Sequence, residues 1–286
     1  MGQISKRRGQ RGSSLLLEAA GLKWLADAEQ DGGIRVAKVV SATDEKLSEE
    51  RITEVAPSAE AARRIGTGLA HMHAAGAPWL GCPPEGWPPA DGEPFPSESL
   101  GRGLWTGRAR TPYASRKDAP ATWGEFFAEY RIMYYVRILR DEGSFGREDA
   151  TLLERVASRV FAGTFDAPEP ALVEQAMKED PATIACARLH GDLWGGNVLY
   201  CAGPTGGALI DPMAYGGHAE TDLAMLALFG FPFLDEVLAG YDEASPLANG
   251  WRERMGLHQL APLLLHCVLF GGAYIPETLR MARRYA

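Results

Sequence analysis

Three polar residues with the spacing of a phosphoryl-transfer site lie two-thirds of the way along the chain. Asp192 and Asn197 stand five residues apart in the segment 189–197, and Asp211 ends a short apolar run. A carboxylate can accept the proton of an attacking hydroxyl, and amide and carboxylate oxygens are hard ligands suited to Mg²⁺. Phosphoryl transfer needs this set, because the protein must orient the nucleophile and neutralise the phosphates. We therefore predict Asp192 as the catalytic base and Asn197 and Asp211 as magnesium ligands, with ATP as the donor.

The flanking residues differ from the protein-kinase pattern of His-Arg-Asp, Asn and Asp-Phe-Gly. Gly191 stands where that pattern has arginine, and Pro212 follows the second aspartate. This difference favours a kinase of small molecules over a protein kinase. The alternative is a set of Asx-capped turns, because His, Asp and Asn all favour loops. The complete pattern favours the catalytic interpretation.

The elements around these residues are predicted to bring them together. Residues 198–200 and 207–210 read as a β-hairpin around a Gly/Pro turn, which would carry Asn197 and Asp211 at its two ends. A helix that opens at Glu220 has an acidic first turn, which suits the helix dipole. Within it, Asp222 could anchor the catalytic loop through backbone N–H groups, a structural role.

A helix is predicted over residues 13–30, with Leu15, Leu22 and Leu25 on one face. Glu18 lies on the same face, and a buried carboxylate is costly unless it is paired. Lys6 is its predicted partner, in an ion pair that would bind the ATP phosphates. The alternative is that Glu18 lies at the edge of the face and Lys6 is disordered.

Residues 34–41 and 51–55 read as strands, and residues 58–76 as a helix capped by Ser58. The passage between them is the predicted hinge, where backbone groups of Glu54, Val55 and Ala56 would bind adenine. We therefore predict two lobes. The N-terminal lobe (1–56) would bind the nucleotide, and the C-terminal lobe (57–286) would contain the catalytic loop and the substrate site. His71 and His73 do not share a helix face, and we expect both on the helix surface.

A Gly-rich hairpin that covers the phosphates normally precedes the lysine strand by a dozen or more residues. Only five residues precede Lys6, and Gly2, Gly9 and Gly12 lack a strand-turn-strand context. We therefore expect an N-terminal lobe without this hairpin, with weakened nucleotide binding.

The C-terminal lobe is predicted to be mostly helical, from the patterns at 123–140, 148–161 and 170–179. Before it, residues 77–120 are rich in Pro, Gly and Trp and predict a long irregular segment. We expect it to pack on the C-terminal part through Trp79, Trp87 and Trp105. The fold class is therefore α+β.

Composition limits the partners. The chain has 286 residues and a net charge of −8, which disfavours nucleic acid, since that binding depends on Lys and Arg. No uninterrupted apolar window of about 18 residues suggests a membrane span, and no signal peptide is recognised. The four cysteines are far apart without metal-type spacing, as expected of reduced thiols in a cytoplasmic protein. The oligomeric state is open.

The sequence resembles the fructosamine/ketosamine kinase family, relatives of the aminoglycoside phosphotransferases and choline kinases with a bilobal protein-kinase-like fold. The most specific match is the Asp-Leu-Trp-x-Gly-Asn form of residues 192–197. Other matching segments are 18–22, 123–127, 211–212, 215–220, 222–224, 229–230, Tyr241, 264–266 and 270–274.

This resemblance implies ATP- and Mg²⁺-dependent phosphorylation of the sugar 3-hydroxyl of a ketosamine, which would reverse glycation of small amines or proteins. It assigns Asp192 as base, Asn197 and Asp211 as metal ligands, and Lys6 and Glu18 as the phosphate-binding pair. Trp194 would stack on the substrate, or only pack, and His218 and His266 are weaker sugar-site candidates. The alternatives are another small-molecule phosphotransferase, acting on an aminoglycoside or choline, and a catalytically weak nucleotide-binding relative.

Overall fold

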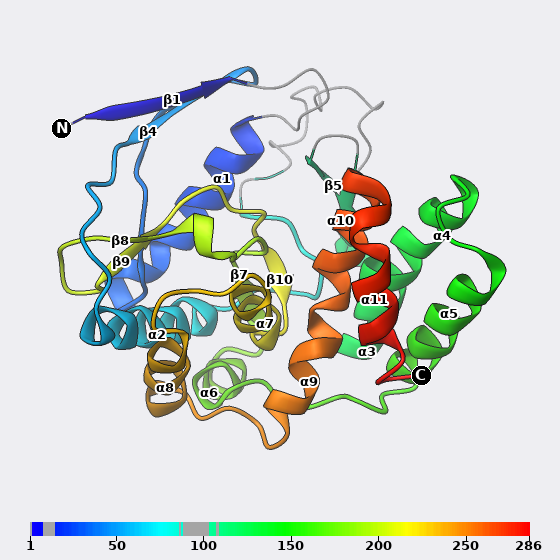
Figure 1. Ribbon diagram of the computed structural model, residues 1–286. Helices are drawn as coiled ribbons and strands as arrows, with labels where there is room; N and C mark the ends of the chain where they lie inside the picture. The colour runs from blue at the N-terminus through cyan, green and yellow to red at the C-terminus, as the bar shows by residue number, and fades with distance from the viewer. Residues whose placement is uncertain (1, 8–14, 86, 88–102, 107–108) are drawn as a thin grey trace.

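The chain folds into an α+β structure in which small β-sheets lie in the N-terminal part and around the predicted catalytic loop, and helices dominate the C-terminal part (Figure 1). The computed structural model describes residues 2–7, 15–85, 87, 103–106 and 109–286. The predicted fold class is confirmed at this level. The lobe boundary near Ala56 stays a prediction.

The N-terminal sheet is antiparallel, with the order β1 (Gln3–Arg7), β4 (Lys46–Glu50) and β3 (Val39–Ala42). It lies next to α1 (Leu15–Ala26), whose Leu22 and Leu25 are buried as predicted (Figure 1). The predicted strand at 51–55 is wrong, since the strand ends at Glu50. Residues 46–50 lack the β-branched residues typical of strands, and pairing with β1 and β3 decides their conformation.

Two further sheets hold the segment predicted to be catalytic. The predicted hairpin is confirmed as β8 (Val198–Tyr200) and β9 (Gly207–Leu209), and β2 (Arg35–Val36) extends it by pairing parallel to β9. Just outside the hairpin, β7 (Ala187–Leu189) pairs with β10 (Tyr215–Gly217). Residues 190–197 and 210–214 are therefore fixed by strand pairing at both ends.

The helix α2 (Ala59–Ala74) begins at Ser58, whose hydroxyl accepts the Ala61 N–H at 3.2 Å, as predicted. It crosses α8 (Leu234–Ala244) very closely, because a Cβ at Gly66 or Gly240 would lie about 2 Å from the other helix's backbone. The prediction that His73 lies on the surface is wrong. His73 is fully buried, since this face of α2 packs on α8 and on α7 (Glu220–Leu228).

A second apolar core belongs to the C-terminal helices, which lie together in Figure 1. They are α3 (Trp123–Phe126), a π-helical segment Phe127–Met133, α4 (Tyr134–Asp141), α5 (Arg147–Phe161), α9 (Trp251–His258), α10 (Leu260–Phe270) and α11 (Ile275–Ala282), while α6 (Ala171–Glu179) packs on α2. The run Trp251–Ala273 is long and apolar enough to cross a membrane by length and composition alone. Half of its most apolar window is buried inside the protein.

The Pro- and Trp-rich segment is only partly described. It contains the hairpin β5 (Gly103–Thr106) and β6 (Ala109–Pro112), so the prediction of a wholly irregular stretch is wrong there. Trp79 and Trp87 pack on the larger apolar core, which α1, α2, α7 and α8 share with the strands around the catalytic loop. The Trp79 indole donates to the Ala114 carbonyl at 2.9 Å. The Trp105 side chain, Gly9 and Gly12 lie outside the described residues. All four cysteines are free and buried, which agrees with reduced thiols.

Candidate active site

The predicted base and the two predicted metal ligands converge in one loop region. The Asn197 amide nitrogen donates to the Asp192 backbone carbonyl at 2.8 Å and to its carboxylate at 3.1 Å, and lies 3.4 Å from the Asp211 carbonyl. Because the nitrogen makes these bonds, the amide oxygen is the atom left to bind a cation. The His190 ring connects the two loops through the Ile210 carbonyl at 2.9 Å. The predicted approach of Asn197 and Asp211 is confirmed.

Asp222 anchors this loop from below, as predicted. Its carboxylate accepts the backbone N–H groups of His190 at 2.7 Å and of Gly191 at 2.9 Å, and it is only 1% exposed. His73 Nε2 lies 3.2 Å from the same carboxylate, and His73 Nδ1 lies 2.8 Å from the Tyr241 hydroxyl. Both carboxylate oxygens of Asp222 are thus engaged, and Asp222 acts as a positioning residue.

Backbone geometry explains the glycine within the loop. Gly191 has a φ of 79°, and a Cβ there would lie 2.2 Å from the Met213 carbonyl oxygen. An arginine, which protein kinases have at this position, would therefore not fit. Asp211 also adopts a left-handed conformation, with a φ of 53°, which is uncommon for a non-glycine residue and clusters at functional sites.

The predicted ion pair from the N-terminal part is present and reaches the same site. Lys6 on β1 contacts Glu18 on α1, and its Nζ donates to Asp211 Oδ1 at 2.7 Å. Glu49 on β4 adds a third carboxylate, and ligand oxygens of Glu18, Glu49 and Asp211 lie within 4.8 Å of one another. Sequence reasoning missed Glu49, since its strand was not predicted.

Charge and burial shift the pKa values of this group. Burial raises the pKa of Glu18 to about 7, against the opposing effect of Lys6. Burial also raises the pKa of Glu49. Burial lowers the pKa of Lys6, but the neighbouring carboxylates outweigh this effect and hold it above its ordinary value. Burial raises the pKa of Asp192, although His190, Asn197 and His266 oppose this shift. A raised pKa suits a carboxylate that acts as a general base.

These residues fit a cation with a phosphate chain. Glu49 Oε2 is buried without a hydrogen-bond partner in the described part of the chain, and the Asp211 side chain is 47% exposed. Oxygen ligands with open positions suit Mg²⁺, which retains waters and phosphate oxygens in its shell. Lys6 supplies a cation beside them, as a phosphate ligand requires.

The predicted hinge runs beside β8. Glu54 forms an isolated antiparallel bridge with Cys201, and the Val55 N–H donates to the Tyr200 carbonyl at 2.9 Å. The Val55 N–H is therefore already used, and the Val55 side chain is exposed. Ala56 follows outside any helix or strand, before α2. Adenine binding at this passage stays a prediction.

Two of the three substrate candidates lie near the loop. The Trp194 ring folds over Gly196, where a Cβ would lie 2.2 Å from it, and is 43% exposed. His266 is half-buried in a cluster of aromatic rings formed by Phe229, Phe270 and Tyr274, and it lies close enough to Asp192 to affect the pKa of that carboxylate. An exposed aromatic surface beside the base suits stacking on a sugar or its substituent.

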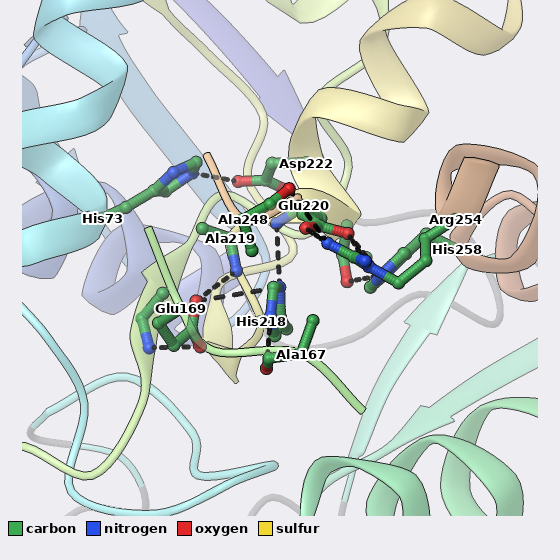
Figure 2. Close-up of polar contacts among 12 residues, drawn as sticks. His73, Ala167, Glu169, His218, Ala219, Glu220, Asp222, Ala248, Arg254 and His258 are labelled. Atoms are coloured by element: carbon green, nitrogen blue, oxygen red, sulfur yellow. Dashed lines mark hydrogen bonds and ion pairs between the residues drawn. The ribbon is translucent and has the colours of Figure 1, made fainter. Parts of the chain in front are cut away.

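His218, the third candidate, lies instead in a buried polar network under α7 (Figure 2). It is 4% exposed, its Nε2 lies 3.4 Å from the Ala167 carbonyl, and its Nδ1 accepts the Glu220 N–H at 3.2 Å. Glu169 accepts the adjacent Ala219 N–H at 3.0 Å. These bonds hold the start of α7, the helix that carries Asp222, so His218 has a structural position.

Arg254 completes this network by donating from two nitrogens to the two carboxylate oxygens of Glu220. Burial opposes this pairing, yet the bonds to His258 and Arg254 hold the pKa of Glu220 at about 2. Burial lowers the pKa of His258 to about 4, so this imidazole is neutral at neutral pH. Because arginine occupies both oxygens of Glu220, the cluster of His218, Glu220 and His258 is built as an ion pair, not as a metal site.

Comparisons with known proteins agree with this geometry. Residues 111–285 match the sequence profile described as "Fructosamine kinase". A probable ketoamine kinase of Vibrio parahaemolyticus is 36% identical over 155 residues, which cover 54% of this chain and 46% of that protein. The chain spans about half the length of the curated relatives it matches.

Solved structures extend the similarity over the whole chain. A protein of Thermobifida fusca, assigned as a fructosamine-3-kinase, is 37% identical, with a TM-score of 0.76 over 99% of this chain and 85% of its own. An ADP-bound aminoglycoside phosphotransferase shares the fold alone, at 13% identity and a TM-score of 0.54, over 100% of this chain and 94% of its own. The fold is therefore protein-kinase-like, and the chain belongs to the fructosamine kinase family.

Proposed function

We propose that this protein is an ATP-dependent kinase that phosphorylates the 3-hydroxyl of ketosamines of the fructosamine or ribulosamine type, a deglycation reaction. The observation that carries the proposal is the convergence of Asp192, Asn197 and Asp211 with the Lys6–Glu18 pair in a chain of this family.

Asp192 acts as the general base. Its carboxylate is held by the Asn197 amide, and its raised pKa favours acceptance of the proton from the sugar 3-hydroxyl as the phosphoryl group is transferred. The loop that carries it is fixed by Asp222, so the base needs no rearrangement to meet the acceptor.

Lys6 binds the phosphates of ATP, and Glu18 orients the Lys6 ammonium group. Asn197 and Asp211 hold Mg²⁺, which supplies charge neutralisation of the phosphates when it is bound. Glu54, Val55 and Ala56 line the adenine end. The phosphate end of the nucleotide site thus combines residues of β1 and α1 with the catalytic-loop region, and the adenine end lies at the passage beside β8.

Trp194 and His266 form the acceptor side of the site. The exposed Trp194 ring supplies a flat face for the sugar or its amine substituent. His266 lies close enough to Asp192 to affect the pKa of that carboxylate, and because its Nδ1 donates to the Pro262 carbonyl at 2.6 Å, its Nε2 can accept a hydrogen bond from a sugar hydroxyl. His218 is left out of this assignment, since it is engaged in the network under α7.

A substrate panel tests the proposal. The protein is incubated with Mg-ATP and, separately, with a fructosyl-amine, a ribulosyl-amine, an aminoglycoside and choline, and ADP release is measured. Turnover with a ketosamine is expected. Turnover with an aminoglycoside or choline alone would assign the chain to a different phosphotransferase, and no ADP release with any of the acceptors would leave a nucleotide-binding relative.

Asp192→Asn tests the role of the base in the same assay. The change is expected to lower kcat by roughly 10²- to 10⁴-fold without unfolding the protein, because it removes a proton acceptor and no core packing. Asp235→Asn, at an exposed position of α8, is the matched control and should leave turnover unchanged. Full activity of Asp192→Asn would refute this assignment.

A further inference from the structure

The guanidinium of Arg131 is buried beside the proposed base with part of its hydrogen-bonding capacity unused. Arg131 lies in the π-helical segment Phe127–Met133 and is 2% exposed. Its Nη1 donates to the carbonyls of Pro112 at 3.0 Å and Tyr130 at 3.2 Å. Its Nε and Nη2 have no hydrogen-bond partner among the described residues. Leaving two charged donors buried and unsatisfied is costly, so this position needs a reason.

The surroundings of Arg131 hold the cation in place without neutralising it. Its guanidinium carbon lies 4.3 Å from the centre of the Tyr215 ring and 4.6 Å from that of Phe126. Aromatic faces attract a guanidinium and restrict its orientation. No ion pair between Arg131 and a carboxylate is found in the described part of the chain. The free edge of Arg131 is therefore oriented and charged: it lies close enough to the Tyr215 hydroxyl to affect the pKa of that group, but Nε and Nη2 make no hydrogen bond of normal geometry with the described residues.

A cavity of about 40 Å³ joins Arg131 to the catalytic loop. Its lining includes Arg131, Tyr215, Gly191, Asp192 and Asp222. A single water needs roughly 10–15 Å³ of such volume, so the cavity takes a functional group of a few atoms and not a whole sugar ring. A group that enters it meets both the cation and the proposed base.

Another arginine shows how this chain satisfies a structural guanidinium. Arg188 stacks on Trp24, with its guanidinium carbon 4.6 Å from the ring centre. It donates to three backbone carbonyls, those of Gly76 at 3.0 Å, Ala75 at 3.1 Å, and Trp24. Arg131 also packs on aromatic rings, but in the described part of the chain only its Nη1 makes hydrogen bonds of normal geometry. The difference indicates that the acceptor for Arg131 comes from a ligand.

We propose that Arg131 is a specificity-determining residue that binds the oxygen on the sugar carbon next to the phosphorylated hydroxyl. In a ketosamine this is the C2 oxygen, as a ketone or as the ring-form hydroxyl, and the inference rests on the function proposed above. The charges of the cavity select such a group: the guanidinium requires an acceptor, and Asp192 requires a hydroxyl donor. Oxygens on adjacent carbons satisfy both at once.

A neutral oxygen fits better than a carboxylate. Asp192 and Asp222 line the same cavity, and a third negative charge there would be repelled. Asp222 itself is unavailable to the ligand, because His190, Gly191 and His73 already occupy its carboxylate. The ketose oxygen beside the acceptor hydroxyl is thus the complement of the groups that remain free.

The inference is tested by a double-mutant-type cycle, in which substitution of Arg131 is combined with removal of the C2 oxygen from the substrate. kcat/KM is measured by ADP release with fructosyl-methylamine and with its 2-deoxy analogue, which lacks the C2 oxygen, for the wild type, Arg131→Met and Arg188→Met. In the wild type, loss of the oxygen is expected to lower kcat/KM roughly 10- to 100-fold, as for a hydrogen bond to a charged donor. Arg131→Met should lower kcat/KM for fructosyl-methylamine by a similar factor. In this variant, kcat/KM for the two substrates should differ by less than about threefold.

Two controls separate recognition from folding. Arg188→Met removes an arginine with similar aromatic packing, and it should keep the wild-type ratio between the two substrates even if it is less stable. Arg131→Lys retains the charge but not the planar fork, and its ratio should narrow as well, so it replaces Arg131→Met if the latter fails to fold.

An equal ratio in the wild type and both Arg131 variants would overturn the inference while leaving the proposed function intact. Absence of turnover of fructosyl-methylamine by the wild type would refute the proposed function and this inference together. The two failures are distinguishable, since only the second abolishes activity before any substitution is made.

Discussion

Replacement of Asp222 by asparagine removes the charge that fixes the catalytic loop while keeping the size of the side chain. The carboxylate accepts two backbone N–H groups, from His190 at 2.7 Å and Gly191 at 2.9 Å, and faces His73 at 3.2 Å. An asparagine keeps one acceptor oxygen and directs its NH₂ group towards a donor. One charge-assisted bond is lost, at about 1.5–3 kcal/mol, and one buried donor is left unpaired, at about 1–3 kcal/mol.

Together these terms predict that Asp222→Asn lowers the free energy of unfolding by roughly 2.5–6 kcal/mol. Turnover should fall as well, because Asp192 lies two residues after the loosened His190. Denaturant unfolding measures the first effect and ADP release the second, with Asp235→Asn as the control expected within about 0.5 kcal/mol of the wild type. A loss below about 1 kcal/mol with full turnover would refute the anchoring role.

Two other predictions concern the N-terminal carboxylate and the loop glycine. Burial raises the pKa of Glu18 from 4.5 to about 7, so the folded state retains a proton that the unfolded state releases, and stability falls as pH rises through this window. Glu18→Gln should therefore remove up to about 3 kcal/mol of that fall, as measured by denaturant unfolding of the nucleotide-free protein at pH 4 and pH 8; an unchanged pH profile would contradict it. Gly191→Ala should lower stability by about 2–3 kcal/mol, because its Cβ would lie 2.2 Å from the Met213 carbonyl oxygen, and an unshifted Tm would show that the loop gives way freely.

Sequence reasoning succeeded where a residue's chemistry limits its neighbours. Glu18 on an apolar helix face demands a cation, and Lys6 contacts it as expected. The hairpin between Asn197 and Asp211 followed from strand residues around a Gly/Pro turn, and it brings both ends together. In these cases local sequence carries the information.

Sequence reasoning failed where packing decides. The strand Lys46–Glu50 has little intrinsic strand propensity and forms through its two neighbours. His73 was assigned to the surface because helix spacing does not say which face meets α7 and α8. The buried partners of His218 come from segments up to about 50 residues away, which no local pattern reveals.

Arg131 was also missed, although a signal was present. It stands within the apolar face of a predicted core helix, as Glu18 stands within another, and the same reasoning on burial costs applies to both. The sequence could not show how many hydrogen-bond acceptors surround the Arg131 guanidinium. That number depends on the positions of Pro112, Tyr215 and the cavity beside Asp192.

The position of the transferred phosphate tests the central claim most directly. Wild-type protein is incubated with Mg-ATP and a fructosyl-amine labelled with ¹³C at C3, and the product is analysed by NMR for coupling between phosphorus and carbon. A phosphate ester on the 3-hydroxyl, formed together with an equal amount of ADP, is the predicted result. A phosphate on another hydroxyl, or ATP consumed with only free phosphate released, would contradict the account.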